Sequence, residues 1–547
     1  MSETNRSFVP SALSWLQDAI GDRLLKYLLD CTSRSLEEML SGDLSPSEKR
    51  IEIINILSGM KQQLPENLDE AAKNEALRNW LTQVDSNGKP VVGVLRQHVS
   101  GAEPVPESQD SLEAVMGVLA VECYPAFLFP LDSFGGQMPI LQEVSRQVYS
   151  LILRHPQAEE FSNLILSDPT FRDAFAAEEK HSGRVAMVYR NTGRAGGVQL
   201  SMLPATILIA AWRHTQDAPS PQAFATEAME QLRLVRNVFA GRQGIVSAKL
   251  AFAGVLLPSN ANLNFGEATV RPVNESDRKI VPESLKGKLG GTDSSGNSTT
   301  INYDGDVLLE CSFFYKVRVE KRQQNIELPF PEDMRPPPVL EQVSTRLRFS
   351  LMLATKRVPR AQLVPTWRYF DEPLGQGTDI SWSDPRMGSP IMPTQLTEAE
   401  AQSWGEWYQR LDAQHVDTIE LALSRILRAV AERREPSDVL IDSVIAWENL
   451  FGTKEGEPTF RVTMCLASLL KESLQERKEF KTRLGKIYAL RSKVVHGSGK
   501  PKEGEYPLCY EALDVAIDAV RLLTSDRVDI LKLRDGAARS ATLLLEN

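Results

Sequence analysis

The chain has 547 residues, of which 42% are hydrophobic, and carries a formal net charge of −10 at pH 7. This length exceeds what a single hydrophobic core usually serves, so we expect several domains. Because some segments have helix patterns and others strand patterns, we expect an α+β protein. The five cysteines are odd in number and widely spaced, which argues against a disulfide framework or a cysteine-based zinc site and favours the cytoplasm. The N-terminal residues lack a signal-peptide pattern and no apolar run is long enough to span a bilayer, so we expect no membrane association.

Residues 1–100 are predicted to form a helical domain. Apolar spacing predicts helices over 11–29 and 49–62, and Ser35 with Glu38 matches a capping box that starts another helix. Residues 24–42 resemble a helix-turn-helix of the repressor kind. Glu37 and Glu38 would stand near the start of its recognition helix and repel phosphate. We therefore expect a structural or protein-binding role for this domain, with DNA binding as the alternative.

The next stretch combines a connection with further helices. The Gly and Pro content of residues 85–106 indicates a loop, and residues 107–243 are predicted to be mostly helical, notably over 140–154 and 223–239. The run TGRAGG at 192–197 is a candidate phosphate loop. It lacks the strand, lysine and Ser/Thr context of a nucleotide site, so a simple turn is favoured.

Composition changes at residue 244. Strands are predicted over 246–258, 268–272, 299–303, 306–319 and 345–355, with a mobile loop over 286–298. No acid–base pair or metal cluster stands out among these residues. We expect residues 244–370 to form a β-rich sensing or regulatory domain, followed by a linker over 371–412.

The remaining elements all have helical periodicity. Helices are predicted over 418–433, 459–470, 474–495 and 507–524. Another helix lies between them: Pro436 breaks the first, Ser437 is expected to cap the next, and Gly452 ends it. An all-α bundle over 413–536 is the natural arrangement, because no segment here shows strand alternation.

The stretch YALRSKVVHG at 488–497 carries the strongest chemical signal, because it pairs Arg491 with His496. RNA supplies its own nucleophile, the 2′-hydroxyl, so a histidine that titrates near neutrality can do the proton transfer. Arg491 can fork onto the phosphate oxygens and stabilise the developing charge. On a continuous helix the two side chains would lie roughly 140° apart. We therefore expect the helix to loosen toward Gly497, or a second subunit to complete the groove.

Charge distribution supports a phosphate-binding surface at this motif. Residues 471–502 contain ten Lys or Arg and three acids, a net +7, so the rest of the chain carries −17. Within it, the residues that we expect to bind RNA are Arg483, Lys486, Lys493 and Lys500. The alternative interpretation is a solvated helix face with a structural histidine.

Two blocks carry a family resemblance: LALSRILRAVAERREPSDVLIDSVIAWENLFG at 421–452 and KIYALRSKVVHG at 486–497. From about 415 to 534 the chain resembles the Apea-like branch of the HEPN superfamily, whose Arg-x4-6-His pattern the motif fits. The resemblance implies a HEPN helical bundle with Arg491 and His496 as active-site residues. We name Ser492, Glu448 and Tyr488 as supporting groups, and no metal ligand or cofactor. Many active HEPN ribonucleases have Asn, Asp or His where this chain has Ser492.

Glu448 precedes further apolar residues in the second helix of the expected bundle, so we expect it to be partly buried. A buried carboxylate needs a partner, and Arg491 is the candidate. The alternative is an exposed position at the helix edge.

Family members with this domain include nucleases of bacterial antiphage and toxin systems, which cleave RNA as dimers. The resemblance therefore implies a metal-independent endoribonuclease for abortive infection, with RNA as substrate, that forms a homodimer or higher homo-oligomer. We expect the upstream domains to hold it inactive until a trigger, for example phage-derived, arrives. The alternatives are a non-catalytic HEPN scaffold that binds a nucleotide or RNA, and a DNA-binding regulator.

Overall fold

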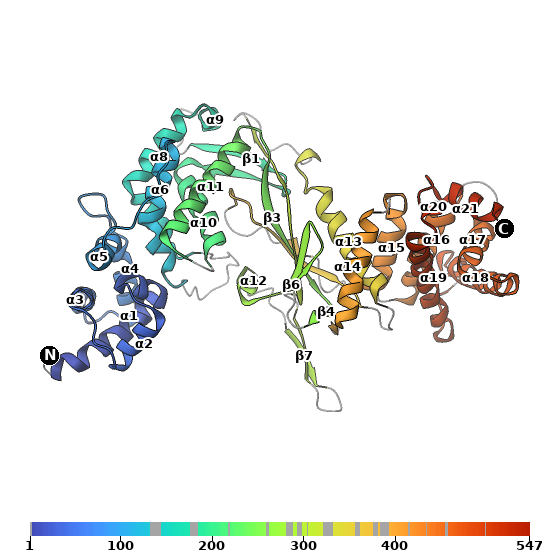
Figure 1. Cartoon of the computed structure of the whole chain (residues 1–547), viewed down its shortest axis with the longest axis horizontal. Helices are drawn as coiled ribbons and strands as arrows, with labels where there is room; N and C mark the ends of the chain where they lie inside the picture. The colour runs from blue at the N-terminus through green and yellow to red at the C-terminus, as the bar shows by residue number, and fades with distance from the viewer. Residues whose placement is uncertain are drawn as a thin grey trace. The chain divides into compact units, whose positions relative to one another are not determined.

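The computed structural model shows a helix-rich α+β protein in which the sheets are mostly antiparallel (Figure 1). It describes residues 3–131, 144–175, 184–216, 219–258, 262–280, 288–292, 298–302, 305–320, 332–355, 361–375, 381–382, 393–413, 416–433, 435–453, 458–497 and 499–546. The chain divides into two compact units. The first comprises Met1–Val246, Phe314–Pro336 and Asp371–Thr378, and the second comprises Ser247–Phe313, Pro337–Phe370 and Asp379–Asn547.

The first unit is mainly helical. Its helices are α1 (Glu3–Leu29), α2 (Ser33–Ser41), α3 (Glu48–Gln63), α4 (Glu70–Leu81), α5 (Val91–Ser100), α6 (Ser111–Cys123), α7 (Arg146–Arg154), α8 (Pro156–Ser167), α9 (Pro169–Arg172), α10 (Leu203–Thr215) and α11 (Pro221–Phe239). A three-stranded antiparallel sheet joins them, in the order β10 (Val317–Glu320), β1 (Val185–Arg190), β2 (Arg194–Gln199). The run TGRAGG forms the β1–β2 hairpin, in which Arg190 pairs with Arg194. The interpretation as a simple turn is confirmed.

Local capping in the N-terminal helices differs from the sequence prediction. The cap of α2 is Thr32, whose Oγ1 accepts a hydrogen bond from the backbone N–H of Ser35 at 3.2 Å. The predicted cap, Ser35, is therefore wrong and lies in the first turn. Helix α5 occupies part of the segment expected to be a loop, and its apolar residues Val92 and Leu95 are buried. Burial of one apolar face compensates for the Gly and Pro residues nearby.

One helical stretch of the described residues, Ser111–Leu128, is long and apolar enough to cross a membrane. It includes α6 and the short 3-10 helix Tyr124–Leu128, and 78% of it is buried inside the fold. The core helix of a folded protein passes the same test of length and hydropathy. Its burial against α8 and α11 is the role that the structure assigns to it.

An imidazole connects three segments of the first unit. His214 of α10 lies between two carboxylates: its Nδ1 is 2.6 Å from Oε1 of Glu227 on α11, and its Nε2 is 2.7 Å from Oδ2 of Asp371. The hydrogen bonds to Asp371 and then to Glu227 raise the pKa of His214 to about 10. The charged imidazolium thus stabilises the packing of α10 on α11.

The second unit contains a six-stranded antiparallel sheet in the order β12-β11-β3-β9-β6-β5. Its strands are β3 (Gly244–Ala253), β5 (Leu263–Asn264), β6 (Ala268–Pro272), β9 (Val307–Tyr315), β11 (Val364–Phe370) and β12 (Ser381–Trp382); β3 and β9 each run from one unit into the other. Smaller pairs are β4 (Val255–Leu256) with β13 (Thr394–Gln395), and β7 (Lys288–Thr292) with β8 (Ser298–Asn302). The register places Ala268 opposite Cys311 and Val270 opposite Leu309, so the buried residues of β6 and β9 lie side by side on the same face of the sheet. The described strands 288–292 and 298–302 replace part of the expected loop over 286–298, and residues 293–297 lie outside the described residues.

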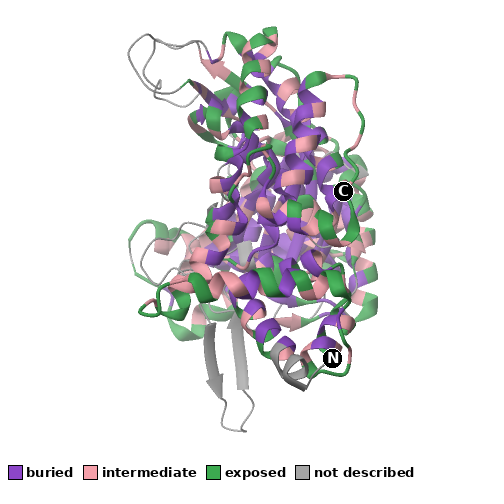
Figure 2. Ribbon diagram, turned by 90° about the vertical axis from the view of Figure 1, so that its left-hand side faces the viewer, coloured by how far each residue is buried: buried purple, intermediate pink, exposed green. Residues whose placement is uncertain are grey.

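The helices of the second unit include a bundle near the C-terminus. They are α12 (Glu275–Ile280), α13 (Pro338–Ala354), α14 (Glu398–Ala413), α15 (Glu420–Ala431), α16 (Pro436–Phe451), α17 (Pro458–Leu470), α18 (Leu474–Val495), α19 (Tyr506–Ser525), α20 (Val528–Leu531) and α21 (Gly536–Leu545). Helix α16 is central and contacts α15, α17, α18, α19 and α21. Trp447 of α16 is fully buried, and its indole N–H donates to the carbonyl of Ala512 at 3.1 Å. Figure 2 shows such buried residues in purple on the inner sides of the helices.

Two side chains hold the bundle together through buried charge. Arg539 of α21 is 1% exposed and donates to the carbonyls of Leu450 (2.8 Å) and Asn449 (3.0 Å), which satisfies the C-terminal end of α16. Asp442 of α16, also 1% exposed, accepts from Arg425 at 2.8 Å and Arg433 at 2.6 Å. The bundle therefore extends to residue 545, beyond the predicted end at 536.

Three further predictions in this unit are wrong. Residues 345–355 were expected to be a strand, but residues 345–354 belong to α13, because burial at Leu340, Val343 and Leu347 follows a helical period. The expected linker 371–412 contains α14, which is fixed to α13 by the indole N–H of Trp404 donating to the carbonyl of Leu347 at 3.0 Å. Finally, Ser437 does not cap α16. The N-cap residue is Glu435, and Pro436 takes the first helical position.

Candidate functional site

Helix α18 determines where the Arg491 and His496 side chains are placed. It begins with a capping box between Ser473 and Glu476, which fixes its first turn. It ends at Val495, and the backbone N–H of His496 donates to the carbonyl of Ser492 at 3.0 Å. Gly497 then adopts a left-handed φ of +71°. The helix thus loosens at the place expected from the sequence, and His496 lies at its exposed end.

Glu448 joins α16 to α18 through two side chains. The hydroxyl of Tyr488 donates to Oε1 of Glu448 at 3.0 Å, and Nη2 of Arg491 lies 3.6 Å from Oε2 of the same carboxylate. Burial and then the charge of Glu448 raise the pKa of Tyr488, so its hydroxyl stays protonated and donates. Glu448 is therefore paired with Arg491, the partner that we expected from the sequence.

One N–H group of the Arg491 side chain makes no hydrogen bond with the described residues. Its side chain is 25% exposed. Its Nε is buried and has no hydrogen-bond partner among the described residues. A buried N–H without a partner is unfavourable, so this atom weakens the packing of the side chain. A phosphate would meet the exposed part of the guanidinium and not the buried Nε.

His496 and Ser492 are not part of the Glu448 cluster. Both residues are exposed, and within the described segments no hydrogen bond or ion pair joins His496 to Arg491. The structure therefore brings Glu448, Tyr488 and Arg491 together, and leaves the imidazole of His496 free to meet a ligand or another subunit.

The four cations that we expected to bind RNA differ in their surroundings. Arg483 pairs with Glu511 at 2.7 Å, Lys493 lies 3.7 Å from Glu505, and Lys500 lies 4.0 Å from Glu435. All three acids come from outside residues 471–502, so the net +7 counted along the sequence overstates the local charge. Lys486 is exposed, and no ion pair is recorded for it in the described part of the chain.

Exposed apolar side chains lie beside the motif, and their exposure was not predicted from the sequence. Val495 at the end of α18 is 47% exposed, and Tyr506 and Tyr510 on α19 are 37% and 49% exposed. The Lys493–Glu505 pair brings the start of α19 to the end of α18. Tyr506 and Tyr510 are four residues apart and share a helix face. No sequence pattern indicates this exposure, because tyrosines at such spacing are usually core residues.

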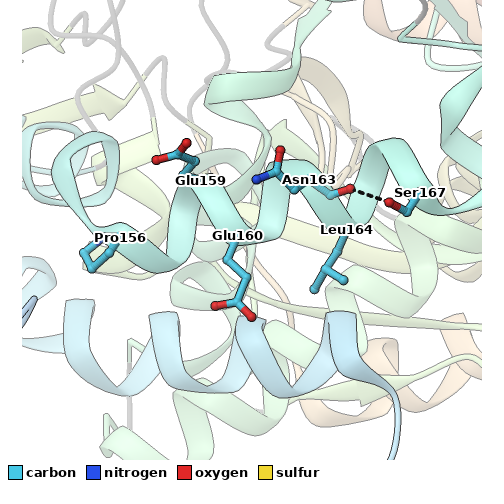
Figure 3. A pocket seen from close by; sticks show the side chains of 6 residues that line it. All are labelled: Pro156, Glu159, Glu160, Asn163, Leu164 and Ser167. Carbon is cyan, nitrogen blue, oxygen red and sulfur yellow. Dashed lines mark hydrogen bonds between the residues drawn. The ribbon is translucent and has the colours of Figure 1, made fainter.

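The other candidate sites have fewer groups suited to catalysis or to binding a phosphate or a metal ion. A cavity of about 370 Å³ lies along α8 and is lined by Pro156, Glu159, Glu160, Asn163, Leu164 and Ser167 (Figure 3). Its two carboxylates would repel a phosphate, and none of the described residues that line it is a cation. The described residues contain no group of three or more His, Cys, Asp or Glu side chains placed to hold a metal ion.

No protein-family model, curated protein or solved structure matches the chain.

Proposed function

We propose that the chain is a metal-independent endoribonuclease of the HEPN type, with its active site at Arg491 and His496. The bundle α15–α21 would be the HEPN domain. The observation that supports this most is the arrangement of Arg491, which pairs with Glu448, keeps 25% of its side chain exposed, and lies about 1.4 helical turns before the exposed His496.

The proposed reaction follows from the chemistry of RNA. His496 takes the proton from a 2′-hydroxyl, the O2′–P bond forms, and the P–O5′ bond breaks. The leaving 5′-oxygen receives a proton, so the products are a 2′,3′-cyclic phosphate and a 5′-hydroxyl. Arg491 stabilises the extra negative charge on the phosphorane. This stabilisation is needed because the site lies at the C-terminal end of α18, where the helix dipole disfavours anions.

A homodimer would complete this site. A single histidine cannot serve as base and acid in one concerted step, whereas two copies of His496 could divide the two roles. The exposed Val495, Tyr506 and Tyr510 provide apolar surface for such a contact, or aromatic rings on which bases stack.

We place this activity in bacterial antiphage defence, as an RNA-cleaving effector in the cytoplasm. A nuclease that attacks cellular RNA must be held inactive until it is needed. The helical first unit and the β-rich part of the second unit would supply that inhibition, and a phage-derived trigger would release it.

A non-catalytic HEPN scaffold is the second candidate. Arg491 is paired with Glu448, and Arg483, Lys493 and Lys500 also have acidic neighbours. Such pairs favour a structural role, in which the same surface holds a nucleotide, an RNA or a second subunit. A DNA-binding regulator is the third candidate, and would show duplex DNA binding with a steep salt dependence.

The decisive experiment compares RNA cleavage by the native chain, Arg491→Ala and His496→Ala, using total tRNA and mRNA. Each variant should reduce cleavage by at least about 10²-fold, as expected for loss of a proton-transfer group or an oxyanion donor. The native products should end in a 2′,3′-cyclic phosphate.

Matched controls are His98→Ala, an exposed histidine of the first unit, and Arg534→Ala, whose side chain is 92% exposed. Both should cleave like the native chain. Equal cleavage by all five proteins would refute the enzyme proposal. Altered oligomer mass in Arg491→Ala, without any native cleavage products, would support the scaffold.

A further inference from the structure

A cavity of about 740 Å³ lies in the first unit, whereas the Arg491–His496 motif belongs to the second unit. Its walls come from the end of α1, the start of α2, α5, and the starts of the 3-10 helix Tyr124–Leu128 and α11. Pockets that hold small organic ligands usually have volumes of about 300–1,000 Å³. The cavity is therefore large enough for a nucleotide-sized molecule.

Positive charge exceeds negative charge on the walls. Three cations line the cavity, Arg23, Lys26 and Arg96, against the two acids Asp30 and Glu103. Arg96 pairs with both acids, because its Nη1 is 2.9 Å from Asp30 and its Nε is 3.3 Å from Glu103, and these three groups together carry a net charge of −1.

With the other two cations, Arg23 and Lys26, the charged groups on the walls sum to +1. The Nζ of Lys26 donates to the hydroxyl of Ser33 at 2.9 Å, and within the described residues neither Lys26 nor Arg23 has a carboxylate partner. These two cations are available to an anion.

Two helices begin at the same cavity. Thr32 caps α2 and Ser220 caps α11, and neither helix has an acid in its first turn. Helix N-termini carry partial positive charge, which acts in the same direction as Arg23 and Lys26. This combination of cations and helix starts favours a phosphate over a carboxylate, because a phosphate offers more acceptor oxygens.

An aromatic and apolar wall completes the site. The rings of Tyr27 and Tyr124 are 5.4 Å apart in an edge-to-face arrangement, and Leu128 lies beside them. The guanidinium carbon of Arg96 lies 4.8 Å from the ring centroid of Tyr27. These contacts hold the wall in place before any ligand arrives, which reduces the entropy lost on binding.

We propose that this cavity binds a small organic phosphate of nucleotide size. The phosphate would lie against Arg23, Lys26 and the starts of α2 and α11. The organic part would pack on Tyr27, Tyr124 and Leu128.

Isothermal titration calorimetry on the full chain tests the site with three separate probes: AMP, ATP and inorganic phosphate. AMP or ATP should bind more tightly than inorganic phosphate, because only the nucleotides contact the aromatic wall. Arg23→Gln and Lys26→Gln should each weaken nucleotide binding at least about 10-fold, which is about 1.4 kcal/mol. Lys49→Gln, an exposed lysine of α3 that does not line the cavity, is the matched control and should bind like the native chain.

Three results would overturn the proposal. They are no nucleotide binding by the native chain, equal binding of inorganic phosphate and nucleotides, and unchanged binding in both variants. Thermal unfolding of each variant checks that it is folded, and the two variants give independent tests. The outcome does not depend on RNA cleavage, because the motif proposed for cleavage lies in the other unit.

Discussion

Removal of the Tyr488 hydroxyl tests whether the Glu448 cluster stabilises the bundle. The hydroxyl donates to the Glu448 carboxylate at 3.0 Å, and hydrogen bonds to charged groups contribute roughly 1.5–3 kcal/mol. The side chain of Glu448 is 34% exposed, so water replaces part of the lost interaction. Tyr488→Phe keeps the ring and its packing on Trp447, 6.2 Å away. We therefore expect the free energy of unfolding to fall by about 1 kcal/mol.

Urea denaturation followed by circular dichroism measures this change. The control is Tyr510→Phe, the same substitution at a tyrosine that is 49% exposed, and it should leave the unfolding midpoint unchanged. RNA cleavage by Tyr488→Phe should fall only a few-fold, because Arg491 retains the Glu448 carboxylate. Equal unfolding midpoints for Tyr488→Phe and Tyr510→Phe would refute the role given to this hydrogen bond.

The pH dependence of stability gives a second measurement on the same variant. The folded chain raises the pKa of Tyr488 above its ordinary value of 10.0, so the folded state holds the phenol proton more tightly than the unfolded state. The resulting stabilisation is complete below pH 10 and is lost as the pH rises above it. The native chain should therefore lose more stability above pH 10 than Tyr488→Phe. Parallel curves for the two proteins would contradict this explanation.

Three further predictions concern stability. Asp442→Asn should lower the free energy of unfolding by about 2 kcal/mol, measured by urea denaturation, because it weakens a buried carboxylate paired with two arginines. Gly497→Ala should lower the free energy of unfolding by about 1 kcal/mol because residue 497 has a left-handed backbone, whereas Gly485→Ala inside α18 should raise it by about 0.5–1 kcal/mol. Melting temperatures that shift in the same direction for both variants would contradict this. The pKa of His214 is raised to about 10, so its charged form stabilises the folded state fully below about pH 6.5, and this stabilisation is lost as the pH rises through 10. The difference in melting temperature between the native chain and His214→Gln should therefore shrink from about pH 6.5 to about pH 10. A constant difference would count against this explanation.

Local patterns predicted several elements closely. The helix over 474–495 and the strand over 268–272 have the bounds of α18 and β6. Both are marked by strong local signals: α18 has a capping box at one end and Gly497 at the other, and β6 is bounded by turn residues. The pairing of Glu448 with Arg491 was also predictable, because a carboxylate among apolar residues needs a cationic partner.

Other features required contacts between distant segments. Helix α14 has little local signal to separate it from a linker, and its position follows from Trp404, which bonds to α13 more than 50 residues away in the sequence. The acids that neutralise Arg483, Lys493 and Lys500 are likewise supplied by neighbouring elements. A charge count along one segment misses them.

The sequence by itself determined the helix-rich α+β class, the helix that carries Arg491, and its end beside His496. These depend on short-range hydrogen bonds and on the period of apolar residues, which are written locally in the chain. Only the tertiary structure decided which side chains meet: Tyr488 on Glu448, Arg539 on the end of α16, and the walls of the cavity at Arg23 and Lys26. Such contacts join residues far apart in sequence, and they form because burial forces each polar group to find a partner in space.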